Sequence, residues 1–198
     1  MQRNEFKNPH VLWHFDRVRE ATNNMMFMFA TTAENEDKRR AFDESIRTAM
    51  GWPPHVKNFY EYRMMFGGIY ERLFQFCVIS LCSDVEVFFK ETFDKYNYNK
   101  GKGSGFFQRL DDVISELTAA GFDFSSIQGS IDKLRLAFQI RHIGIHNMGV
   151  VDQGFVDKTG EGAVGSMYPI DQDSYRKMFD SYTVFLKYLD DKLPNLPA

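Results

Sequence analysis

The residues best suited to chemistry lie in one short stretch, Arg141-His142-Ile143-Gly144-Ile145-His146-Asn147-Met148-Gly149. An imidazole with a pKa of about 6.5 can take up or release a proton at neutral pH. A guanidinium stays charged and binds a phosphate through a planar fork of donors. We therefore expect His146 to carry proton transfers and Arg141 to bind a phosphate group.

The same residues also allow a purely structural interpretation. Cationic side chains near the C-terminus of a helix offset the helix dipole and bind its last free carbonyls. Arginine followed closely by histidine is also common by chance, and Arg3 with His10 forms a second such pair in this chain. Positions five apart differ by about 140° around an ideal helix, so Arg141 and His146 become neighbours only if the helix loosens before Gly149.

The surrounding residues extend the pattern. The stretch RHIGIHNMG, followed by VVDQGFV, resembles the HEPN superfamily, helical bundles with an Arg-x(4–6)-His motif on a late helix. The earlier segment SLCSDVEVFFKETF is similar to that superfamily's central helix, where an acidic residue at the position of Glu86 is common. The resemblance covers about residues 55–193, and its specific part is Arg141 to Gly149. Residues 1–50 show no such resemblance.

The resemblance implies a metal-independent endoribonuclease without a cofactor, in which both protomers of a homodimer supply Arg141 and His146. The ribose 2′-hydroxyl attacks the adjacent phosphate and leaves a 2′,3′-cyclic phosphate and a 5′-hydroxyl. Such proteins are often toxins or phage-defence effectors that cut tRNA or mRNA, which implies an antitoxin or defence-complex partner. Two alternatives remain: a non-catalytic helical module that binds RNA, a nucleotide or a protein, and a structural subunit held to another chain by its aromatic surface.

Four further residues are candidates to support this site. Asn147 is placed to orient the scissile group, and His142 to contact RNA or to assist. Glu86 and Asp84 are candidates to face the motif helix and to hold Arg141 by an ion pair. Each of these two carboxylates can also be a solvated or structural group.

The sequence gives no support for a metal site. His10 and His14 have the i, i+4 spacing that can bind zinc, but their segment holds no cysteine and no third ligand. Cys77 and Cys82 lie five apart in an apolar helix and match no zinc spacing. We expect them to be reduced core thiols of a cytoplasmic protein.

Hydrophobic periodicity predicts an all-α protein with one helical domain, residues 1–198, made of N-terminal helices at 1–50 and a HEPN-like core at 55–193. The first expected helix lies at 4–33, with an interruption near Pro9, and a second follows the charged patch at 34–40 and runs to about Met50. The later helices are expected at 56–96, with a break at Gly67-Gly68, at 106–120, at 127–146, and from Asp171 or Asp173 to about Leu193. The most apolar helix, 69–93, belongs at the centre. A short irregular turn insertion precedes the last helix.

The composition limits the kinds of partner that the protein can bind. The 198 residues suffice for one good-sized core, and 16% aromatic residues favour self-association through apolar surface. A net charge of −3 argues against general coating of nucleic acid, although not against recognition at one cleft. We find neither an apolar run of about 20 residues that could span a membrane nor an N-terminal signal, so we expect a cytoplasmic protein without membrane contact.

Overall fold

The computed structural model describes residues 1–17, 23–103 and 105–194. Its α-helices are α1 (Pro9–Asp16), α2 (Asn23–Arg39), α3 (Glu44–Ala49), α4 (Phe59–Met64), α5 (Ile69–Tyr96), α6 (Leu110–Ala119), α7 (Gln128–His146), α8 (Gln153–Thr159) and α9 (Gln172–Lys192). Within these ranges there is no strand, only isolated bridges at Ala41–Asn58 and Val150–Met167, so the all-α prediction is confirmed. No helix in the described ranges is both long and apolar enough to span a membrane.

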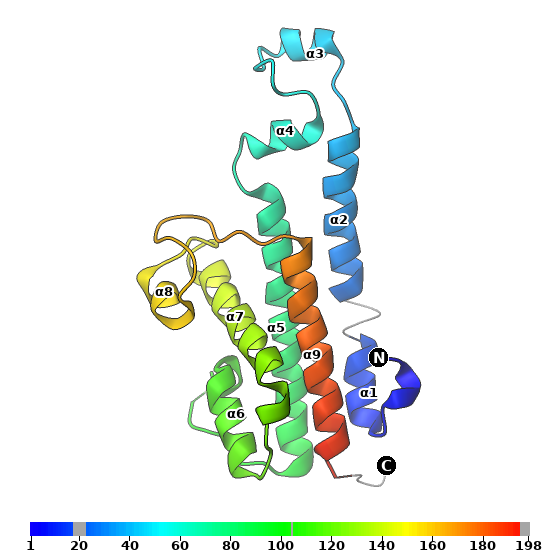
Figure 1. Ribbon diagram of the computed structural model, residues 1–198, viewed down its shortest axis with the longest axis vertical. Coiled ribbons are helices and arrows are strands. Elements are labelled where there is room, and N and C mark those ends of the chain that lie inside the picture. The colour runs from blue at the N-terminus through cyan, green and yellow to red at the C-terminus, as the bar shows by residue number, and fades with distance from the viewer. Residues whose placement is uncertain (18–22, 104, 195–198) are drawn as a thin grey trace.

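Helix α5 forms the centre of the bundle, and α2, α7 and α9 pack alongside it (Figure 1). Its enclosed side chains are Phe74, Cys77, Val78, Leu81, Cys82, Val85, Phe88, Phe89 and Phe93. Fully burying one large apolar side chain contributes about 1.5–3 kcal/mol, which favours a central place for this segment. The predicted break also occurs, because Gly67 (φ 72°) and Gly68 (φ 57°) adopt left-handed conformations between α4 and α5.

The N-terminal helices differ from the prediction. The charged patch at 34–40 lies largely within α2, which continues to Arg39, and the expected second helix is reduced to the short α3. An ion pair of 2.7 Å between Glu34 and Lys38, four residues apart, supports the helix where a break was expected. The predicted interruption near Pro9 is confirmed by the start of α1. Residues 18–22 of the expected first helix lie outside the described residues.

The insertion before the last helix is partly helical, which the sequence did not predict. We expected a short irregular turn, whereas residues 153–159 form α8. The Asp152 side chain accepts a hydrogen bond from the Phe155 backbone N–H at 2.8 Å, and thereby caps the new helix. The remainder of the insertion is irregular up to α9, which Asp171 caps through the Ser174 N–H at 2.8 Å.

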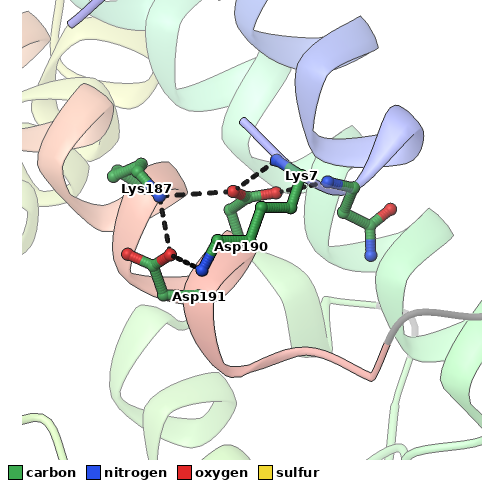
Figure 2. A network of polar contacts seen from close by, with 5 residues as sticks. Lys7, Lys187, Asp190 and Asp191 are labelled. Atoms are coloured by element: carbon green, nitrogen blue, oxygen red, sulfur yellow. Dashed lines mark hydrogen bonds and ion pairs between the residues drawn. The ribbon is translucent and has the colours of Figure 1, made fainter. Parts of the chain in front are cut away.

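Asp190 joins the start of the chain to the last helix (Figure 2). Its carboxylate is only 2% exposed and accepts hydrogen bonds from the backbone N–H groups of Lys7 (2.9 Å) and Asn8 (2.7 Å). Lys187 Nζ lies 3.4 Å from the same carboxylate and 2.7 Å from Asp191. A buried carboxylate is costly unless it is bonded in this way. The contacts fix the beginning of α1 against the end of α9.

Candidate functional site

Helix α7 carries the predicted site on its last turns and packs against α5 and α9. It remains helical through His146 and ends where Asn147 and Gly149 donate backbone hydrogen bonds to the Ile143 carbonyl at 2.8 and 3.0 Å. Gly149 has a φ of 90°, and a Cβ there would lie 2.5 Å from Gln75 Oε1. The positive φ favours glycine at this position, and any side chain here would have to displace the Gln75 amide.

Arg141 is held against the central helix by Glu86. Arg141 Nη2 lies 2.7 Å from Glu86 Oε1, and the two side chains are only 15% and 17% exposed. The groups are not aligned as a hydrogen bond, and Arg141 Nε has no acceptor among the described residues, so the contact is mainly electrostatic. Burial raises the pKa of Glu86, and the nearby Arg141 opposes that rise.

Asp84 is not brought to this site. Its carboxylate accepts a hydrogen bond of 2.7 Å from Asn23 Nδ2 on α2. Positions two apart on a helix differ by about 200°, so Asp84 and Glu86 face different neighbours of α5. The proposed supporting role of Asp84 beside Arg141 is therefore not compatible with its position, whereas Glu86 does lie beside Arg141.

His142 and His146 lie side by side on the exposed surface of α7, with ring centroids 4.8 Å apart. Burial lowers the pKa of His142, His146 and Lys158 lower it further, and Asp152 opposes the change. The helix does not loosen before His146, so Arg141 and His146 keep different directions around α7. They nevertheless line one cleft together with His142.

Asn147 connects the end of α7 to α8. Its side-chain amide donates a hydrogen bond to Asp152, the residue that caps α8 through its other carboxylate oxygen. The Asn147 amide is thus engaged in positioning the neighbouring helix. That helix brings Lys158 to the cleft, a residue that the sequence analysis did not identify because α8 itself was not predicted.

The cleft has a volume of about 1030 Å³ and lies between α6, α7 and the end of α8. Its lining includes the charged residues Arg109, Asp111, Asp112, Asp132, Lys133, Arg135, Arg141, Lys158 and Glu161, together with His142 and His146. Two of the arginines are paired within the cleft: Arg135 with Asp111 (2.5 Å) and Asp132 (2.8 Å), and Arg109 with Asp112. Lys133 and Lys158 have no ion pair among the described residues, so they are available to an anionic ligand.

Chemically, the cleft offers two imidazoles for proton transfer and several cations for a phosphate. Comparisons of this chain with protein-family models, with curated proteins and with solved structures found no match. The resemblance to the HEPN superfamily therefore stays a prediction from the motif residues.

Proposed function

We propose that this chain is a metal-independent endoribonuclease that acts in the cleft at the end of α7. In the proposed reaction a base removes the proton of a ribose 2′-hydroxyl, and the oxygen attacks the adjacent phosphorus. The bond from phosphorus to the 5′ oxygen breaks, and an acid gives that oxygen a proton. The products are a 2′,3′-cyclic phosphate and a 5′-hydroxyl, so one acid and one base suffice.

The observation that carries this proposal is the pair His142 and His146 in the same cleft as Arg141. His146 is exposed there and is assigned the proton transfer. Burial, with a smaller contribution from His146, lowers the pKa of His142 and so favours the uncharged form of its imidazole. Arg141, with Lys133 and Lys158, would stabilise the phosphate as negative charge develops on it.

A second copy of the chain would complete the site across a two-fold axis. Apolar side chains that a dimer could bury lie beside the motif, since Phe76, Ile145 and Met148 are all exposed. Arg72 connects Phe76 on α5 to the end of α7, because it lies 4.6 Å from the centre of the Phe76 ring and donates a hydrogen bond of 3.1 Å to the Gly144 carbonyl. With both copies present, one His146 can serve as the base and the other as the acid.

One observation favours the non-catalytic alternative, a module that binds RNA, a nucleotide or a protein. The cleft contains the carboxylates of Asp111, Asp112, Asp132 and Glu161, and Arg141 is already paired with Glu86. A phosphate backbone would have to avoid these negative charges. In that case the cleft would bind its ligand without cutting it.

The two functions are separated by one set of variants assayed on cellular RNA in EDTA. The nuclease proposal predicts cleavage by the wild type, loss of at least about 100-fold in His146→Ala, and no change in His55→Ala. His55 is an exposed histidine in the connection between α3 and α4, which makes it a matched control. If none of the proteins cuts RNA but Arg141→Ala binds it more weakly than the wild type, the binding module is correct instead.

A further inference from the structure

Three side chains capable of binding a metal ion meet where α1 packs beside the end of α5. His10 and His14 lie one turn apart on α1, and Glu91 extends from α5. Their ligand atoms all lie within 4.8 Å of one another. We propose that His10, His14 and Glu91 bind one Zn²⁺ ion between α1 and α5. No third ligand lies near the two histidines in the sequence, whereas the fold supplies one from α5.

The spacing of the three groups suits a small divalent ion. Zinc bonds of 2.0–2.2 Å in a tetrahedral site place neighbouring ligand atoms about 3.3 Å apart. His14 Nε2 and Glu91 Oε2 are already 2.9 Å apart. The widest separation in the group, 4.8 Å, must shorten by about 1.5 Å to reach that spacing. Glu91 can move toward a bound ion because its side chain is 47% exposed.

The histidines are held in place by their surroundings. Asn8 caps α1 through the His10 backbone N–H at 3.1 Å, and the His10 ring nitrogen Nε2 lies 3.1 Å from Thr92 Oγ1. Both rings also contact Phe88, with centroids 5.8 Å away for His10 and 5.1 Å for His14. Such outer contacts fix the orientation of a metal-binding imidazole before the ion arrives.

The donor set of the group is compatible with a metal, because imidazole nitrogens and carboxylate oxygens are both common zinc ligands. Lys95 and Arg17 lie near the two histidines and oppose a cation, but both are exposed and screened by solvent. Two imidazoles and one carboxylate favour zinc and leave a coordination position for water.

This site is separate from the proposed nuclease cleft. Glu91 and Glu86 are five positions apart on α5 and therefore about 140° apart around its axis. One faces α1, and the other faces α7 through Arg141. The zinc ion would hold α1 against α5 and would have no part in RNA cleavage, so the two proposals stand or fall independently.

The test is a titration of the full chain with ZnCl₂ after removal of metals by chelation and dialysis. We expect one Zn²⁺ per chain and a rise of several degrees in Tm. Glu91→Gln and His10→Gln should each weaken Zn²⁺ affinity at least about tenfold. Lys95→Gln should strengthen it, since that change removes a nearby positive charge. Circular dichroism would verify that each variant is folded.

The chain provides a control in His142 and His146, a second pair of histidines with i, i+4 spacing, which is exposed and forms no three-ligand group in the described part of the chain. The double variant His142→Gln/His146→Gln should bind Zn²⁺ as the wild type does. The Trp52→Phe variant isolates the fluorescence of Trp13, whose ring lies 4.8 Å from that of His14. Co²⁺ bound at the proposed site should quench this fluorescence. Absence of stoichiometric Zn²⁺ binding, unchanged affinity in Glu91→Gln, or loss of binding only in the double variant would each overturn the proposal.

Discussion

At the scale of single residues, Glu86 determines where Arg141 lies in the cleft. The Arg141 side chain is only 15% exposed, and Glu86 is its ionic partner in the described structure. A carboxylate in this position lowers the energy of the buried charge and fixes where the arginine lies. It also competes with any phosphate for the same donors, so Glu86 adjusts both stability and ligand affinity.

Replacing Glu86 by alanine should therefore destabilise the fold. The change leaves the Arg141 charge enclosed without compensation, and we expect the free energy of unfolding to fall by about 2–4 kcal/mol. Urea denaturation followed by circular dichroism measures this loss. Asp111→Ala removes one of the two exposed partners of Arg135 and should cost less than about 1 kcal/mol. Equal losses in both variants would show that the Arg141–Glu86 pair is not specially stabilising.

At the scale of elements, the position of the cleft depends on how α7 ends. Gly144 and Gly149 let α7 approach α5 closely, since a Cβ on either would lie within 3.0 Å of a side-chain atom of α5. The turn after Gly149 then leads into α8, which Asn147 and Asp152 hold beside the motif. Two glycines and two polar side chains thus determine where His146 and Lys158 lie relative to each other.

A comparison of two glycines tests this role of Gly149. Gly149 and Gly121 have similar positive φ values, 90° and 99°, but a Cβ at Gly121 meets no atom within 4 Å. Gly121→Ala should therefore cost only the backbone strain, about 1–2 kcal/mol. Gly149→Ala adds the clash with Gln75, so its midpoint in thermal or urea unfolding should be clearly lower. Similar midpoints for the two variants would mean that Gln75 moves away without cost.

The elements also show what the sequence could predict. The long helices α5, α7 and α9 follow from apolar periodicity and from local signals such as Gly67-Gly68 and Asp171. Helix α8 was missed because its seven residues are too short for a periodic pattern, although Asp152 is a standard N-cap residue. Other features depend on helix packing, which local sequence does not encode. These are the pairing of Glu86 with Arg141, the position of Asp84 away from Arg141, and the approach of Glu91 to His14.

At the scale of the whole molecule, the N-terminal segment is joined to the last helix. Asp190 on α9 binds the backbone of Lys7 and Asn8, and α2 packs along α5, so the N-terminal helices form part of the same bundle as the core (Figure 1). The proposed zinc site would add a second attachment of α1, at α5. The cleft lies on the other side of α5, between α6, α7 and α8.

Asp190→Ala should weaken the whole fold. The variant leaves one buried backbone N–H group, that of Asn8, and one partly buried group, that of Lys7, without acceptors, which should lower the free energy of unfolding by about 2–4 kcal/mol. Asp191→Ala is the matched control, because Asp191 is exposed and its ion pairs should contribute less than about 1 kcal/mol. Chemical denaturation of the two variants gives both values. If Asp190→Ala is as stable as Asp191→Ala, then α1 is not anchored by this carboxylate.

The measurement that tests the central proposal most directly is the chemistry of the RNA ends that the protein produces. The wild type would be incubated with cellular RNA in EDTA beside His146→Ala, and the termini of any fragments analysed. Attack by the 2′-hydroxyl predicts 2′,3′-cyclic phosphate and 5′-hydroxyl ends from the wild type and no fragments from His146→Ala. Fragments with 3′-hydroxyl and 5′-phosphate ends, or equal cleavage by both proteins, would contradict the proposed site and its chemistry.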